Sequence, residues 1–203
     1  MSARENSIYI AVSAPSGAGK TSLCRKVLKA FPDMRYSVSY TTRRPRPGEV
    51  NGKDYFFISE SEFRDMIDRG EFVEWADNYG CLYGTPRKAM QEHLEQGHDL
   101  LLDVDPRGAK ALKENYPGGV FVFVLPPSAE VLRDRLKGRG SEPENVVKKR
   151  LENSMDEIKE VFWYDYIIFN EKIDEAANRL RSIYLAEKSR RERQMDRIRQ
   201  YMK

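Results

Sequence analysis

The chain of 203 residues is poor in cysteine and histidine, with two of each. Cys24 and Cys81 lie far apart in the sequence, and neither has a partner at the short spacing of a metal site. No apolar run approaches the ~20 residues that cross a bilayer, and the start MSARENS lacks the apolar segment of a signal peptide. The sequence therefore predicts a cytoplasmic protein with reduced thiols and no membrane partner.

A large excess of charge of one sign is also missing, since the formal net charge is +3. The segment 186–203 carries seven Lys/Arg and three Asp/Glu, and its net charge of +4 leaves −1 for the rest of the chain. Such a body argues against a nucleic-acid surface, which needs clustered Lys and Arg. The tail is expected to continue the last helix, with Met195, Ile198 and Met202 at helical spacing. It fits a solvated helix end, and a partner-binding role is the alternative.

Apolar runs and amphipathic segments alternate along most of the chain, an order typical of a parallel sheet covered by helices. Strands are predicted at 8–12, 36–41, 100–104, 120–125 and 166–169. Helices are predicted at 20–31, 86–96, 106–115, 128–137, 142–161 and from 173 onward. Between 42 and 84, turn residues and short aromatic strands surround one helix, which begins at the capping box Ser59-x-x-Glu62. The expected fold class is α/β, a parallel sheet flanked by helices with a small α+β insertion.

The segment 13–21, SAPSGAGKT, lies between the first predicted strand and the first predicted helix. Gly17 and Gly19 let successive backbone N–H groups point at one anion, and the helix that follows adds its positive end. Lys20 would place an ammonium group on the outer phosphates of a nucleotide, and Thr21 would give Mg2+ a hydroxyl. An ordinary strand-to-helix turn is the simpler alternative. The motif in this context predicts a site for a nucleoside triphosphate.

A second candidate site lies in the insertion, where Arg43, Arg44 and Arg46 fall within four positions and Tyr55 follows a glycine-containing turn. A guanidinium group binds a phosphate dianion through two parallel bonds, and a tyrosine hydroxyl can add a third. A solvated basic loop is the alternative. The aromatic residues and tight turns around the arginines favour phosphate binding.

Glu74 lies further along the insertion, beside Trp75 and between apolar residues. A carboxylate in such surroundings either shifts its pKa or meets a pair of hydrogen-bond donors. The N1–H and N2–H2 edge of guanine is such a pair. An exposed acid on a strand is the alternative for this residue.

A third group of cations is formed by Arg135, Arg139 and Arg150. Gly138 and Gly140 flank Arg139 and loosen the chain between two predicted helices, which carry Arg135 and Arg150. This arrangement describes a mobile flap that brings cations toward phosphates. Ordinary arginines on helix surfaces are the alternative.

The chain closely resembles the guanylate kinases over about 7–184. The motifs that carry the resemblance are SAPSGAGKT, SVSYTTRRPRPGEVNGKDYFF, GEFVEWA with YGT, LLLDVD and RLKGRG…KKRL. The resemblance implies one domain with a P-loop NTPase-type core, a GMP-binding insertion and a helical lid. We expect the core at 7–38 and 86–184, the insertion at 39–85, the lid region at 135–150, and a basic C-terminal helical tail at 185–203. The implied reaction is in-line transfer of the ATP γ-phosphoryl group to GMP, and to dGMP, with Mg2+ as cofactor.

The resemblance also implies a role for each matching residue. The ATP loop would comprise Ala14, Pro15, Ser16, Gly17, Ala18, Gly19, Lys20 and Thr21, with Asn170 beside the adenine ring. The GMP phosphate would be held by Arg43, Arg46, Tyr55 and Tyr83, with Glu49 orienting the arginines. Guanine would be read by Ser39, Glu74, Thr85 and Asp105. Catalysis would involve Lys20, Arg43, Arg135, Arg139 and Arg150, and Mg2+ would be held by Thr21 and, through water, by Asp103.

Two other functions compete with this interpretation. One is a catalytically inactive guanylate-kinase-like module that binds phosphopeptides, and the other is a P-loop kinase with a different acceptor. Inactive modules characteristically lose residues that this chain keeps, namely Lys20, Arg135, Arg139 and Arg150. The chain departs from the family pattern at Pro106-Arg107, where many members have an aromatic-Gln pair, and it has Ala14 where the general loop pattern has glycine. Assembly into a homo-oligomer stays open.

Overall fold

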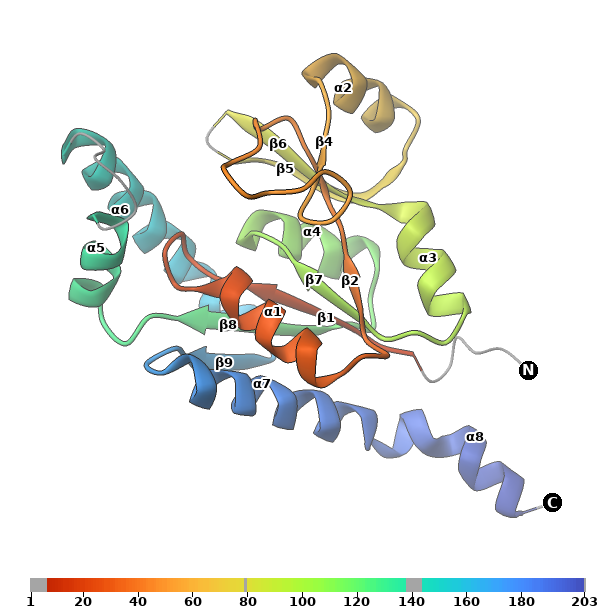
Figure 1. Ribbon diagram of the computed structural model, residues 1–203. Helices are drawn as coiled ribbons and strands as arrows, with labels where there is room; N and C mark the ends of the chain where they lie inside the picture. The colour runs from red at the N-terminus through yellow and green to blue at the C-terminus, as the bar shows by residue number, and fades with distance from the viewer. Residues whose placement is uncertain (1–6, 79, 138–143, 203) are drawn as a thin grey trace.

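The computed structural model describes residues 7–78, 80–137 and 144–202. Its larger sheet has five parallel strands in the order β2-β7-β1-β8-β9 (Figure 1). They are β1 (Tyr9–Ser13), β2 (Arg35–Ser37), β7 (Leu100–Asp103), β8 (Val120–Leu125) and β9 (Tyr166–Phe169). The helices that cover its faces are α1 (Lys20–Ala30), α3 (Arg87–Glu95), α4 (Pro106–Asn115) and α7 (Ile173–Lys188). The predicted α/β fold class is confirmed.

Alternate residues of β1 supply the two halves of the core, because successive side chains of a strand point to opposite faces. Ile10 and Val12 pack in one cluster with Leu23 of α1 and Leu180 of α7. Ala11 lies in the other cluster, which contains side chains of α3 and α4. Burial of a large aliphatic side chain contributes about 1.5–3 kcal/mol. The central strand therefore binds both helical layers and fixes the point at which the chain leaves it at Ser13.

A smaller four-stranded sheet forms the insertion, with the order β4-β3-β6-β5. Its elements are β3 (Tyr40–Thr41), β4 (Phe56–Phe57), α2 (Glu60–Asp68), β5 (Phe72–Asn78) and β6 (Cys81–Pro86). Phe63 and Phe72 stack at its centre, with ring centroids 4.5 Å apart. The Ser59 hydroxyl accepts a 3.2 Å hydrogen bond from the Glu62 amide, as the capping sequence predicted.

One predicted strand was wrong in its extent, and one strand was missed. The run 36–41 is two strands, because Ser37 pairs with Leu102 in the larger sheet whereas Tyr40 pairs with Gly84 and Phe56 in the smaller one. The segment 81–86 was not predicted as a strand, yet it forms β6 between β3 and β5. Strand pairing between distant segments decided both outcomes.

The region of the expected lid contains α5 (Ala129–Lys137) and α6 (Glu144–Lys159), followed by a 3-10 helix, Glu160–Trp163. Leu132 and Leu136 of α5 pack against Leu151 and Ile158 of α6. The helix predicted at 142–161 thus changes its winding in its last turn. Its predicted capping residue Ser141 and the candidate Arg139 lie outside the described residues.

The basic tail was expected to continue the last helix, and this expectation was wrong. Helix α7 ends at Lys188, and a separate helix, α8 (Arg191–Tyr201), follows. The turn is fixed by buried Glu187, which accepts a 2.5 Å hydrogen bond from the Tyr166 hydroxyl and lies 2.9 Å from the Arg190 guanidinium group. Within the described ranges, no helix combines the length and the apolar composition needed to cross a membrane.

Asp99 precedes β7 and connects it with the start of β1 and with α7, at the end of the larger sheet where the two strands begin. Its carboxylate accepts hydrogen bonds from the Ile8 amide at 2.9 Å and the Tyr184 hydroxyl at 2.6 Å. The Lys188 ammonium group lies 2.9 Å from the same carboxylate. The buried acid thereby connects the start of β1 with α7 and holds the strand that leads into the glycine-rich loop.

We expect Asp99→Ala to lower the free energy of unfolding by about 2–3 kcal/mol, because it leaves buried donors without their acceptor. Urea denaturation measures the loss. Asp174→Ala is the matched control, since it removes an exposed ion pair with Lys26 and should cost under about 1 kcal/mol. Equal losses in the two variants would contradict the role given to Asp99.

Candidate functional site

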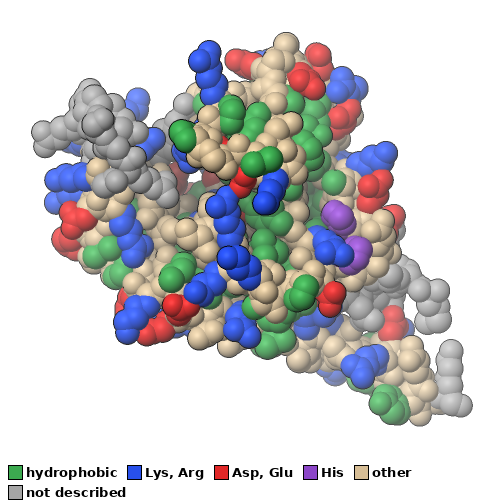
Figure 2. Space-filling model, viewed as in Figure 1, with side chains coloured by type: hydrophobic (Ala, Val, Ile, Leu, Met, Phe, Trp, Pro, Cys, Tyr) green, Lys and Arg blue, Asp and Glu red, His purple; other side chains and the backbone are tan. Residues whose placement is uncertain are grey.

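A cavity of about 200 Å³ lies between the ends of β1 and β7 and the insertion. The glycine-rich loop and residues 103–105 line one side of it. The other side is formed by Ser39, Arg43, Arg46, Tyr55, Glu74 and Tyr83 of the insertion, and by Arg150 and Glu157 of α6. Figure 2 shows Lys and Arg side chains on the face beneath the insertion. An ion pair between Arg25 and Asp54 joins α1 to the insertion.

The glycine-rich loop follows β1 without a break and ends at Lys20, the first residue of α1. Gly17 and Gly19 have φ angles of 97° and 93°, a left-handed backbone that glycine adopts without strain. A side chain on Gly19 would also come within 2.6 Å of the Asn170 amide nitrogen. Both glycines are therefore required by the backbone that the loop adopts.

Two predicted site residues hold this loop from outside the cavity. The Asn170 amide group donates a 2.7 Å hydrogen bond to the Ala18 carbonyl. The Arg135 guanidinium group donates to the same carbonyl at 3.3 Å and to the Asn170 carbonyl at 3.1 Å. Neither side chain is among the described residues that line the cavity. In this structure, Asn170 and Arg135 support the loop.

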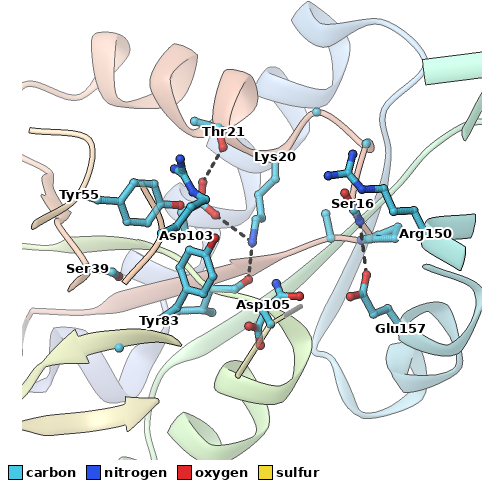
Figure 3. A pocket seen from close by; sticks show the side chains of 18 of the residues that line it. Ser16, Lys20, Thr21, Ser39, Tyr55, Tyr83, Asp103, Asp105, Arg150 and Glu157 are labelled. Atoms are coloured by element: carbon cyan, nitrogen blue, oxygen red, sulfur yellow. Dashed lines mark hydrogen bonds and ion pairs between the residues drawn. The ribbon is translucent and has the colours of Figure 1, made fainter. Parts of the chain in front are cut away.

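Lys20 and Thr21 both contact Asp103, the last residue of β7 (Figure 3). The Lys20 ammonium group lies 2.8 Å from one Asp103 oxygen and donates to the Val104 carbonyl at 2.6 Å. The Thr21 hydroxyl donates to the other Asp103 oxygen at 3.1 Å. Burial acts to lower the pKa of Lys20, but the charge and hydrogen bond of Asp103 outweigh it and raise the pKa. The ammonium group therefore stays ionised in the cleft.

Glu74 of β5 places a buried carboxylate in the same cavity. The Thr85 hydroxyl, on the paired strand β6, donates a 2.5 Å hydrogen bond to one of its oxygens. Burial raises the pKa of Glu74 to about 7; the Asp105 charge adds to the rise, while the Thr85 hydrogen bond opposes it. Asp105 itself caps α4, accepting a 2.7 Å hydrogen bond from the Gly108 amide.

Arg43 is held by contacts on several sides. Its guanidinium group lies 2.9 Å from a Glu49 oxygen, and its central carbon is 5.4 Å from the centre of the Tyr55 ring. The other Glu49 oxygen accepts a 2.7 Å bond from the Arg46 amide. Burial raises the pKa of the Tyr55 hydroxyl, which therefore remains a donor. In Figure 3, the Tyr55 and Tyr83 rings point toward Lys20 and Asp103.

The structure brings most of the predicted site residues together. Glu49 and Thr85 lie behind the cavity wall and bond to Arg43 and Glu74, which line it. Sequence reasoning missed some lining residues, among them Asn78, Gly84, Val104 and Glu157. Gly84 lies inside the motif YGT and Val104 inside LLLDVD, so their positions alone could have suggested them.

Glu157 had no signal in the sequence, because only the packing of α6 brings it to the loop. Its carboxylate accepts a 3.3 Å hydrogen bond from the Ser16 amide (Figure 3). Burial raises its pKa. In this structure, one backbone amide of the glycine-rich loop is therefore already hydrogen-bonded to a carboxylate.

The glycine-rich loop connects a parallel strand to a helix, and its lysine contacts a carboxylate on the neighbouring strand of the sheet. This arrangement defines a P-loop nucleotide-binding protein. The chain belongs to the guanylate kinase family, whose family model matches residues 6–187. It is 53% identical to the guanylate kinase of Geobacter metallireducens over 187 residues, 92% of each chain. It is 54% identical to that of Syntrophus aciditrophicus over 190 residues, 94% of this chain and 91% of the relative.

A solved structure is also similar. The crystal structure of guanylate kinase from Anaplasma phagocytophilum has a TM-score of 0.79 to this chain at 34% sequence identity. The match covers 93% of this chain and 90% of that one. Sequence and fold therefore agree that the chain is a member of this family of kinases.

The contact of Lys20 with Asp103 gives a prediction for the protein without nucleotide. Lys20→Met should lower the free energy of unfolding by about 2–4 kcal/mol, because the Asp103 side chain, 3% exposed, loses its cation. Adding Asp103→Asn should recover part of the loss, since the buried charge is then removed as well. Urea denaturation of the two single variants and the double variant measures the coupling. Strict additivity would contradict the pairing.

Proposed function

We propose that this chain transfers the γ-phosphoryl group of ATP to the phosphate of GMP, giving ADP and GDP, and that it accepts dGMP as well. The observation that carries the proposal is the presence of the Glu74 carboxylate and the phosphate loop in one cavity. A phosphate loop alone does not identify the acceptor, whereas a buried carboxylate in the same cavity favours an acceptor base that presents N–H donors. Membership in the guanylate kinase family supports the same assignment.

On the donor side, the amides of 14–21 would bind the ATP phosphates and Lys20 would neutralise their charge. In this structure, Lys20 bonds to Asp103 and to the Val104 carbonyl, so incoming phosphates would compete for the ammonium group. We assign Arg150, which lines the cavity, and Arg135, which holds the loop, to the same triphosphate. Arg139 stays a prediction from the resemblance, as does the place of Asn170 beside the adenine ring.

Mg2+ would be held by the Thr21 hydroxyl and, through water, by the Asp103 carboxylate. Hydroxyl and carboxylate oxygens suit this hard cation, and the two groups already lie 3.1 Å apart, so they fit it. Among the described residues, no group of three or more His, Cys, Asp or Glu could hold a metal, so phosphate oxygens would complete the shell. When bound, Mg2+ would neutralise charge on the phosphates.

On the acceptor side, Arg43, Arg46, Tyr55 and Tyr83 would hold the GMP phosphate. Glu49 fixes Arg43 by an ion pair, so the fork that binds phosphate is oriented before the substrate arrives. The base would be read by Glu74 together with Ser39, Thr85 and Asp105. Thr85 donates to one Glu74 oxygen, which orients the carboxylate toward the guanine donors. The reaction then requires in-line positioning and charge neutralisation, with no covalent enzyme intermediate.

The test is a coupled assay of ADP formation with GMP, dGMP, AMP, CMP and UMP as acceptors. We expect GMP to exceed AMP by ~10³-fold or more in kcat/KM, since adenine presents a lone pair where guanine presents N1–H. Lys20→Met serves as the negative control and should lower kcat by ~10²–10³. Comparable kcat/KM for GMP and AMP would overturn the proposal.

The raised pKa of Glu74, about 7, gives a dependence on pH. The ionised Glu74 carboxylate accepts hydrogen bonds from guanine, and the ionised form is lost as the pH falls through about 7. The value of kcat/KM for GMP should therefore fall toward tenfold per pH unit below that point. The GMP phosphate also titrates near pH ~6. Glu74→Gln separates the two effects, because it keeps only the phosphate titration. A wild-type profile that matched the Glu74→Gln profile would contradict this role.

A further inference from the structure

Gly108 lies buried in the first turn of α4, where glycine is unfavourable. Alanine stabilises a helix better than glycine, because glycine loses more backbone freedom on folding. The backbone of Gly108 is helical and has no positive φ that would call for glycine. The absence of a side chain at this position therefore needs another cause.

The cause lies in the space that the Glu74 carboxylate fills. A methyl group on Gly108 would come within 3.0 Å of one Glu74 oxygen, which real side chains do not do, and within 3.1 Å of its carboxyl carbon. It would also lie 3.5 Å from an Asp105 oxygen. The separation from Asp105 is an ordinary contact, so the Glu74 carboxylate is the group that a methyl group on Gly108 would displace.

The Glu74 carboxylate, the group that would have to move, is held by its neighbours. The other Glu74 oxygen is bonded to the Thr85 hydroxyl at 2.5 Å, and the Glu74 backbone pairs with Thr85 across β5 and β6. Val73, the preceding residue, packs in the same core cluster as Ala109 of α4. Asp105 is held by the amide of Gly108 itself. Strand, helix and carboxylate are therefore fixed relative to one another.

We propose that Gly108 is a positioning residue for acceptor specificity: it leaves the space in which the Glu74 carboxylate is presented to guanine. This inference rests on the proposed function. In this proposal, Gly108 does not contact the acceptor nucleotide and acts only through Glu74. The glycine is kept despite its effect on the helix because any larger residue would displace the group that reads the base.

Gly108→Ala should raise KM for GMP about tenfold or more and lower the GMP-to-AMP ratio of kcat/KM by a similar factor. The value of kcat at saturating GMP should change little, because the lost contact acts equally on ground state and transition state. KM for ATP should stay within about twofold, since the phosphate loop does not touch Gly108. Ala111→Ser adds one atom to the same helix away from Glu74 and should leave all three constants unchanged.

Rescue identifies the partner of the clash. Glu74→Asp shortens the side chain by one methylene and withdraws the carboxylate from Gly108. In that background, Gly108→Ala should change KM for GMP by less than about threefold. If Gly108→Ala fails to fold, its combination with Glu74→Ala must restore folding, because the atom that it meets is then gone.

The possible outcomes distinguish a failure of the role given to Gly108 from a failure of the proposed function. If the wild type does not prefer GMP, the proposed function fails. If the wild type prefers GMP and Gly108→Ala keeps both KM and the GMP-to-AMP ratio within about twofold, only the role of Gly108 fails. An equal rise in KM for ATP, or a full effect of Gly108→Ala in the Glu74→Asp background, would also overturn it.

Discussion

The site depends on the pairing of β1 with β7. Their parallel register sets Val12 opposite Asp103, so the glycine-rich loop and a carboxylate leave the sheet side by side. Lys20 closes the remaining distance, with its ammonium group 2.8 Å from Asp103. A buried lysine or a buried aspartate alone would be costly, and each lowers the cost of the other. A nucleotide therefore meets a cation that is already ionised and already held inside the cleft.

The insertion extends this arrangement to the acceptor side, because β5 is both a core strand and a carrier of site residues. Val73 joins the core cluster of α3 and α4, and Glu74, which follows it at an irregularity in the β5–β6 register, lines the cavity with its carboxylate beside α4. The same packing against α4 thus positions the Glu74 carboxylate. Arg43 is oriented differently, by its ion pair with Glu49 and by aromatic rings. The acceptor subsite therefore combines one rigid element with one loop held by charge.

The features that could be predicted from the sequence are those whose structure is determined by residues adjacent in the chain. The run at 120–125 is β8 and the run at 166–169 is β9, because both are rich in β-branched and aromatic residues and are too short for a typical helix. The loop at 13–21 was also predictable, since a phosphate cradle needs contiguous residues. Features decided by tertiary contacts were missed. The run 36–41 divides between two sheets, and Glu157 reaches the loop only through the packing of α6.

Several departures from local rules coincide with the site. Gly17 and Gly19 have a left-handed backbone, Gly108 is a buried glycine in the first turn of α4, and the Glu74 carboxylate is buried. Each lowers stability when taken alone, and each lies within or beside one cavity. Elsewhere, β1 alternates apolar residues between two helical layers and follows those rules closely. The core therefore supplies the free energy that lets the chain keep a charged, glycine-lined cleft. A sequence position that breaks a local rule without an evident structural reason is thus where a functional contact should be sought first.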